Sequence, residues 1–186
     1  MLHPNFRTDY DHYLGCPRAP LELIQYGDFQ CEHCADVYPV IKWLLDSFGD
    51  RLKFVYRHYP IPTRHPLSLE AAVATESAAL QGKFWYMHDI IYENQKFLTR
   101  TSFSEFAREI DLDTCAFEDC REHRKLFRKV ISDFEGGVRG GVDSSPTFFI
   151  NGARYNGFND FENLYSALQN INQFECKTIE RSVRKT

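Results

Sequence analysis

The chain has 186 residues, 43% of them hydrophobic and 15% aromatic, which is enough to bury the core of one domain or of one domain with an insertion. Its formal net charge of −4 excludes the strongly basic surface that favours nucleic acid, so we expect no nucleic-acid partner. No stretch approaches the roughly 20 apolar residues of a membrane span, and the first residues lack the apolar segment of a signal peptide. We therefore expect a cytoplasmic protein with no membrane contact.

The first third of the chain predicts a strand, a helix and a second strand. Residues 1–20 form a polar arm whose Gly and Pro residues indicate turns rather than regular structure. The apolar run at 21–26 predicts a strand. After it, apolar residues recur at helical spacing up to Gly49, which ends the predicted helix. The aromatic and β-branched run at 52–59 predicts the second strand.

The remainder of the chain is first helical and then mixed. From residue 66 the spacing of apolar residues predicts helices at 67–80, 83–94, 102–110 and 114–135. After a glycine-rich segment, a strand at 147–150 leads into Asn151-Gly152, the dipeptide typical of a tight hairpin, and a last helix is expected at 160–171. The first two strands with their helix predict a parallel βαβ unit, to which the hairpin adds antiparallel strands.

The most informative pair of residues is Cys31 and Cys34, two thiols three residues apart where the first strand meets the helix. Composition alone would produce such a pair about 0.2 times in a chain of this length, so the setting carries the inference. Cys31, beside the helix N-terminus, feels unpaired N–H groups and the helix dipole, which favour its thiolate. We therefore predict dithiol–disulfide exchange with Cys31 as the exposed nucleophile. Cys34, on the apolar face, is predicted to be the shielded, resolving thiol.

The two residues between these cysteines are expected to tune the thiolate in opposite directions. His33 can add positive charge or a hydrogen bond beside the Cys31 sulfur, whereas Glu32 places a negative charge near it. Both side chains are expected to be exposed, so solvent moderates each effect.

Taken together, these segments resemble the DsbA-like branch of the thioredoxin superfamily, which often reads Tyr-Gly-Asp-Phe-x-Cys-x-x-Cys and later Thr-Pro-Thr-Phe-Phe-Ile-Asn-Gly. The corresponding segments here are 26–34 and 145–152, and the resemblance extends over about 11–171. It implies an α/β thioredoxin fold, a central mixed sheet with flanking helices, carrying a helical insertion. The implied parts are an arm at 1–20, a thioredoxin-fold domain at 21–60 and 130–172, an inserted helical subdomain at 61–129 and a flexible tail at 173–186.

The resemblance also implies how the site is completed. It implies a cis peptide bond between Ser145 and Pro146 facing Cys31, with Ser145, Pro146 and Thr147 contacting an extended substrate segment. Two positions depart from the family pattern. Gln25 stands where the family often has a buried carboxylate that manages the proton of the second cysteine. Glu32 stands where strongly oxidising relatives tend to have Pro, which predicts a weaker oxidant.

Three functions follow as hypotheses. The first is a thiol-disulfide oxidoreductase acting on protein or peptide dithiols and disulfides, recycled by glutathione or by a partner oxidoreductase. The second is a non-catalytic thioredoxin-fold module that senses redox state or binds a partner protein. The third, a kappa-like glutathione-dependent transferase or isomerase, fits less well because that branch typically replaces the dithiol with a single Ser or Cys.

Other reactive side chains have simpler interpretations. No cofactor or metal is expected, because His58, His65 and His88 show no close ligand spacing and zinc on the dithiol would need two more ligands. His88 is interpreted as a core histidine. Of the other cysteines, Cys120 is predicted to be a buried structural thiol, with Cys115 not placed to pair with it, and Cys16 and Cys176 to be free thiols in flexible ends. A basic stripe at 121–129 is interpreted as a solvated helix face, with docking of glutathione or an acidic partner as the functional alternative.

Overall fold

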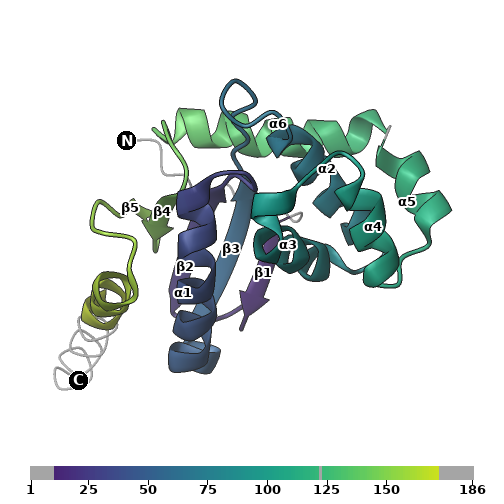
Figure 1. Ribbon diagram of the computed structural model, residues 1–186. Helices are drawn as coiled ribbons and strands as arrows, with labels where there is room; N and C mark the ends of the chain where they lie inside the picture. Colours follow the sequence, from purple (N-terminus) through teal and green to yellow (C-terminus); the bar gives the residue numbers. More distant parts are fainter. Residues whose placement is uncertain (1–10, 122, 172–186) are drawn as a thin grey trace, which may run out of the picture.

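A mixed β-sheet forms the centre of the computed structural model, which describes residues 11–121 and 123–171 (Figure 1). Over these residues the sheet has five strands in the order β1-β3-β2-β4-β5. The central strands run parallel and the outer pairs antiparallel. The strands are β1 (His12–Gly15), β2 (Leu21–Gly27), β3 (Leu52–His58), β4 (Thr147–Ile150) and β5 (Ala153–Arg154).

Helices cover the sheet from both sides. Helix α1 (Glu32–Phe48) and the 3-10 turn η1 (Gly49–Arg51) connect the parallel strands β2 and β3, which confirms the predicted βαβ unit. The inserted helices are α2 (Ser68–Ala79), α3 (Phe84–Glu93), η2 (Gln95–Phe97), α4 (Ser102–Glu109), α5 (Thr114–Arg121) and α6 (Arg124–Arg139). Figure 1 shows α2 to α5 of the insertion gathered on the β1 side of the sheet, while α6 runs across the top of the view toward β4. A further helix at 161–171 packs on α1, with the ring of Phe161 6.1 Å from that of Trp43.

Adjacent residues of β2 enter two different hydrophobic cores, as the alternation of a strand requires. Leu23 packs in the large core with α1 and α3, whereas Ile24 packs in a second core on the opposite face, against Phe134 of α6. Because both faces of β2 are covered, apolar residues stand at neighbouring positions, Leu23 and Ile24, rather than alternating strictly with polar ones. This double burial fixes the end of β2, from which the dithiol loop starts.

One strand was not predicted. Residues 1–20 were expected to form turns, but His12 to Gly15 form β1 and pair antiparallel with Tyr56 to Lys53 of β3. A four-residue edge strand has little periodicity of its own, and its hydrogen bonds come from a partner about forty residues away. The local sequence therefore indicated the turns and missed the strand.

The predicted single helix at 114–135 is also wrong. It is two helices, α5 and α6, because His123 has an extended backbone (φ −73°, ψ 120°) that starts a new helix. Helix α6 then continues to Arg139 through a Gly-Gly pair that was expected to lie after the helix. A Cβ at Gly137 would lie 3.0 Å from the ring of Tyr26, so this glycine allows α6 to pack closely on the sheet. Close packing of the helix on the sheet, not the end of a helix, therefore explains the glycine at this position.

The inserted subdomain was expected to end at residue 129, but α6 spans this boundary without a break. The insertion and the sheet are thus joined by a continuous helix. Over residues 11–121 and 123–171, no helix has both the length and the apolar character needed to cross a membrane. The predicted tail at 173–186 lies outside the described residues.

Candidate active site

The two thiols of the predicted dithiol lie at the start of α1, one turn apart. Cys31 is the N-cap residue, with an extended backbone, and Cys34 lies in the first turn. The carbonyl oxygen of Cys31 accepts hydrogen bonds from the backbone N–H groups of Cys34 (3.0 Å) and Ala35 (3.2 Å). Both thiols are free. The sulfur of Cys31 is thus held at the positive end of a 17-residue helix, where negative charge is stabilised.

Cys31 is less accessible than the sequence predicts. It is 6% exposed and Cys34 is 0% exposed. The expectation of an exposed nucleophile is corrected by a contact that no local pattern could reveal. The Cys31 thiol donates a hydrogen bond to the backbone oxygen of Ser145, 3.2 Å away and 114 residues later in the chain. The remaining access to this sulfur therefore lies beside the loop that carries Ser145.

The pKa of the Cys31 thiol is lowered from its ordinary value of 9.0 to about 5. The largest cause is the hydrogen bond from the Cys34 side chain, because a neighbouring S–H donor stabilises the thiolate. Burial acts in the opposite direction, and the side chain of Ser145 and the backbone N–H groups of Cys34 and His33 lower the pKa further. The predicted acidic thiol is therefore supported by several donors that converge on one sulfur.

Cys34 has the opposite electrostatics. Burial raises its pKa well above the ordinary value, and the nearby Cys31 thiolate raises it further. The backbone N–H of Asp28 lies 3.5 Å from its sulfur and partly offsets these effects. At neutral pH the pair thus consists of one thiolate and one thiol. The two thiols thus differ in acidity in the predicted direction, while their roles as nucleophile and resolving thiol stay predictions.

The residues between the cysteines point away from the dithiol. The side chain of His33 is 82% exposed, with Nδ1 3.7 Å from the carboxylate of Asp36. Its contribution to the Cys31 pKa comes from its backbone N–H group. Glu32 is also exposed. The predicted tuning by these side chains is therefore weakened by solvent on both sides.

The loop before β4 completes the site. The peptide bond between Ser145 and Pro146 is cis, as the resemblance implies, and both residues are half-buried beside Cys31. Thr147 is only 5% exposed, and its hydroxyl donates to the backbone oxygen of Ser144 at 2.8 Å. Of the three predicted substrate contacts, Ser145 and Pro146 thus have accessible surface, while the Thr147 side chain is turned inward.

A buried carboxylate, Asp28, shapes the loop between β2 and α1, and the sequence analysis missed it. The side chain of Asp28 is fully buried. Its Oδ1 accepts a hydrogen bond from the backbone N–H of Gln30 (2.8 Å), and its Oδ2 accepts from the backbone N–H of Ile61 and from Nδ1 of His65 (both 2.8 Å). The only local signal was the Asp in the Tyr-Gly-Asp-Phe segment. Two of its three partners come from a loop some thirty residues later.

The insertion also contacts the dithiol loop through Gln95, in η2. Its side-chain N–H group donates to the backbone oxygens of Phe29 and Cys31, both at 2.9 Å. This is a second residue that the sequence did not single out. Because it binds the carbonyl of Cys31 itself, it links the position of the insertion to that of the Cys31 residue.

Gln25 lies buried in β2 beneath the dithiol, as its position predicts, at 2% exposure. It lines a small cavity of about 30 Å³ together with Cys34. The other lining residues come from β1, α1 and α3, namely Leu14, Tyr38, Ile41, Lys42, Leu45, His88, Asp89 and Tyr92. A buried amide thus stands where relatives often carry a titratable carboxylate, next to a cavity with its own titratable side chains.

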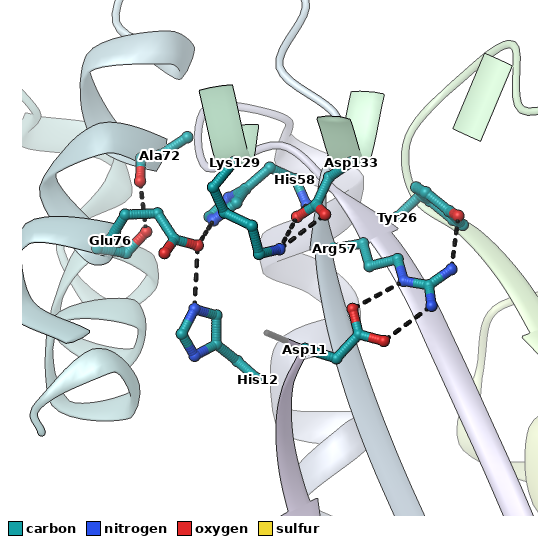
Figure 2. Close-up of polar contacts among 10 residues, drawn as sticks. Asp11, His12, Tyr26, Arg57, His58, Ala72, Glu76, Lys129 and Asp133 are labelled. Carbon is teal, nitrogen blue, oxygen red and sulfur yellow. Dashed lines mark hydrogen bonds and ion pairs between the residues drawn. The ribbon is translucent and has the colours of Figure 1, made fainter. Parts of the chain in front are cut away.

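A network of buried charges fixes the insertion on the sheet (Figure 2). Glu76 of α2 accepts hydrogen bonds from Nε2 of His12 (3.0 Å) and of His58 (2.8 Å), which outweigh burial and keep its pKa well below the ordinary range. Asp133 of α6 accepts from the backbone N–H of His58 at 3.2 Å and from Lys129. The network joins β1, β3, α2 and α6, so it holds these two helices on the sheet.

The comparisons with known proteins agree with this geometry. A family model described as Thioredoxin matches residues 7–170. The chain belongs to this family. Among its curated relatives, a Na(+)/H(+) antiporter NhaA 1 of Salinispora arenicola is 35% identical over 160 residues, which are 86% of this chain and 24% of the relative. Another from Mycolicibacterium gilvum is 38% identical over 161 residues, 86% of this chain and 26% of the relative. The chain thus spans about a quarter of the length of these relatives.

Solved structures share the fold of this thioredoxin-family protein. Wolbachia pipientis alpha-DsbA1 superposes with a TM-score of 0.84 at 18% identity, covering 96% of this chain and all of that one. A thioredoxin-like oxidoreductase from Silicibacter pomeroyi gives 0.77 at 22% identity, covering 93% and 98%. BdbD from Bacillus subtilis gives 0.75 at 20% identity, covering 87% and 92%. The predicted DsbA-like thioredoxin fold is confirmed.

The remaining reactive side chains of this thioredoxin-family protein lie apart from the dithiol. Cys16, Cys115 and Cys120 are free, with Cys115 exposed and Cys120 half-buried, and Cys176 lies outside the described residues. Among residues 11–121 and 123–171, no three His, Cys, Asp or Glu side chains form a group that could hold a metal.

The basic stripe predicted at 121–129 is not one helix face. The break before α6 divides it, with Arg121 paired to Glu118 on α5 and Lys129 paired to Asp133 on α6. At least these two side chains of the stripe therefore form ion pairs within the protein. The side chains of Arg124, Lys125 and Arg128 are exposed on α6, as expected of a solvated helix face, and docking of glutathione or an acidic partner there stays a prediction.

Proposed function

We propose that this protein is a thiol-disulfide oxidoreductase that exchanges disulfides with protein or peptide thiols through Cys31 and Cys34. The observation that carries the proposal is the division of charge in the dithiol. With a pKa of about 5, Cys31 is about 99% thiolate near neutral pH, whereas Cys34 remains a buried thiol. The thiolate is the attacking form in disulfide exchange, so the site is prepared for the first step.

The reaction in the reducing direction has two exchange steps. The Cys31 thiolate attacks one sulfur of a substrate disulfide. The substrate S–S bond breaks, a mixed disulfide forms, and one substrate thiolate leaves. Cys34 then loses its proton and attacks the Cys31 sulfur, which forms the Cys31–Cys34 disulfide and releases the second substrate thiolate. The protein is oxidised by two electrons and the substrate is reduced. Oxidation of a substrate dithiol is the same sequence in reverse.

The proposed substrate site is the loop that carries Ser145 and Pro146. It touches the Cys31 sulfur and keeps accessible surface, so an extended segment lying along it would bring its own sulfur to the thiolate. Because the Thr147 side chain is turned inward, we expect contacts at that position to involve the backbone.

Recycling by glutathione or a partner oxidoreductase is part of the proposal, as is a cytoplasmic location. That location would favour net reduction of substrates, because thiols there are kept reduced. The low pKa of Cys31 acts the other way, since it stabilises the reduced dithiol and makes the pair more oxidising. The reduction potential measured against glutathione determines which direction prevails.

The proposal is tested by insulin reduction and by oxidation of a dithiol peptide, with each cysteine replaced in turn. We expect Cys31→Ser to abolish both reactions and Cys34→Ser to accumulate a mixed disulfide without turnover. Cys120→Ser is the matched control, because this thiol lies on α5 away from the site, and it should retain full activity. Negligible turnover in the wild-type protein, with partner binding that still depends on the oxidation state of the pair, would instead support the non-catalytic module.

A further inference from the structure

The proton of Cys34 has no evident acceptor in the proposed reaction. Cys34 is 0% exposed, its pKa is raised by burial, and the neighbouring position in β2 is Gln25, whose amide does not titrate in the accessible range. Each turnover nevertheless requires this thiol to lose or gain one proton. A route must therefore lead from a fully buried sulfur to solvent.

The cavity beneath the dithiol supplies such a route. Its volume of about 30 Å³ is enough for one or two water molecules, since a single water needs roughly 10–15 Å³ of this space. Its lining includes polar groups that could hold water, on Gln25, Tyr38 and His88. It begins at Cys34 and reaches Asp89 and Lys42, whose side chains are 35% and 48% exposed. The cavity therefore connects the buried sulfur with charged groups at the surface.

His88 is the titratable group of this cavity that is suited to accept a proton. Its Nδ1 lies 2.9 Å from the carboxylate of Asp89, and an ionised carboxylate only accepts hydrogen bonds, so Nδ1 carries the hydrogen. In the neutral ring Nε2 is then the basic nitrogen, and it makes no hydrogen bond to any residue in 11–121 or 123–171. Burial among aromatic rings lowers the pKa of His88, which keeps the ring neutral near pH 7.

The other buried acid near Cys34 is already engaged. The carboxylate of Asp28 accepts three hydrogen bonds, and Asp28 does not line the cavity. Accepting a proton there would disrupt the loop that positions the dithiol. Protonation of His88 at Nε2 would break no hydrogen bond among the residues that the structure describes.

We propose that His88, oriented by Asp89, exchanges the proton of Cys34 through water in this cavity. The inference rests on the proposed oxidoreductase function and names a further residue for it. When Cys34 attacks the mixed disulfide, its proton passes to water while a proton from that water passes to Nε2 of His88, giving an imidazolium paired with Asp89. The proton then leaves to solvent. During reduction of the Cys31–Cys34 disulfide the same path returns a proton to the departing Cys34 thiolate.

The pH dependence of this relay is set by the groups that surround the ring. They are Cys34, Tyr38 and Lys42 on α1, Tyr56 and His58 on β3, and Asp89 and Tyr92 on α3. Asp89 favours the imidazolium, whereas Lys42 and His58 oppose it. The tyrosines next to Cys34 have raised pKa values, since burial disfavours their phenolates, and they stay neutral throughout the range of the test.

The test separates the two sulfurs by stopped-flow reaction of the reduced protein with dithiobis-nitrobenzoate. The first burst of nitrothiolate reports attack by Cys31, and the second reports attack by Cys34 on the mixed disulfide. In His88→Gln we expect a first phase within twofold of wild type and a second phase slower by about tenfold or more. The wild-type second phase should be level near neutral pH and fall on acidification through a pKa below 6.5. In the variant it should rise about tenfold per pH unit, as hydroxide becomes the base. His123→Gln, at an exposed histidine, is the matched control and should leave both phases unchanged.

Asp89→Asn provides an independent variant, with circular dichroism used to confirm the fold of each protein. It should slow the second phase and move its midpoint to lower pH, because the imidazolium loses its carboxylate. This variant decides the matter if His88→Gln does not fold, and an unchanged midpoint overturns the relay. A second phase in folded His88→Gln that is as fast as in wild type also overturns the relay. So does a result in which Asp28→Asn loses the pH dependence of the second phase while His88→Gln and Asp89→Asn keep it. None of these outcomes decides the proposed function, which is tested separately by turnover of the wild-type protein in the insulin and dithiol-peptide assays.

Discussion

The pH dependence of the reduction potential reports directly on the state of Cys31. Above its pKa of about 5, the reduced protein holds a Cys31 thiolate and a Cys34 thiol, whereas the disulfide holds neither proton. Reduction by two electrons then takes up one proton. An ordinary dithiol, with both pKa values near 9, would take up two over the same range. The experiment therefore measures the reduction potential of the protein at pH values from about 4 to about 8.

The structure sets the size of the effect. For a two-electron couple a tenfold change in equilibrium constant is about 30 mV, so the potential should fall by about 30 mV per pH unit above about pH 5 and about 60 mV per unit below it. The lowered pKa stabilises the deprotonated, reduced state, and this contribution is lost as pH falls through about 5. Near pH 7 it amounts to about two pKa units, or ~2.7 kcal/mol, which raises the potential by ~60 mV relative to an ordinary thiol.

The assay equilibrates the protein with glutathione or dithiothreitol buffers of known potential at each pH and counts free thiols by alkylation and mass spectrometry. A break in slope near pH 5 is the expected result. A single slope of about 60 mV per unit over the whole range would refute the low pKa of Cys31. Thiolate absorbance of wild type and of Cys31→Ser gives an independent reading, because only the wild type should show a titration near pH 5.

Three further predictions concern single side chains. Ser145→Ala removes a buried hydroxyl that has no hydrogen-bond partner of its own and that lowers the pKa of Cys31, so it should raise that pKa in the absorbance titration, and an unchanged midpoint would show that this hydroxyl does not stabilise the thiolate. Gly137→Ala should lower the free energy of unfolding in urea by about 1–3 kcal/mol, because its Cβ meets two tyrosine rings at 3.0–3.1 Å. Gly136→Ala, with only an arginine side chain 3.9 Å away, should be neutral or stabilising by up to about 1 kcal/mol, and equal losses at both positions would contradict the close-packing argument. Glu76→Gln should destabilise by about 3 kcal/mol at neutral pH, since it leaves the buried His58 and the half-buried His12 without their carboxylate. Because the pKa of Glu76 is lowered by folding, its contribution is present above about pH 4.5 and is lost only in stronger acid, which urea titrations at several pH values would detect.

The features that the sequence predicted correctly depend on neighbours in the chain. The spacing of Cys31 and Cys34, the helix that follows them and the hairpin at Asn151 are encoded within a few residues, because helical and strand periodicities are local. The errors arose where local signals were weak or had a distant cause. The edge strand β1 depends on its partner β3, and Gly137 is selected by the rings against which α6 packs, not by the end of a helix.

What the sequence determined by itself is therefore the presence and order of the two thiols at a helix N-terminus. Only the tertiary structure decided their environment. It buried Cys31 against Ser145, gathered Asp28 and Gln95 around the dithiol loop, and opened the cavity that links Cys34 to His88. The reason is that pKa values depend on burial and on donors and charges within a few ångströms, and in a folded chain those neighbours come from segments up to 114 residues apart.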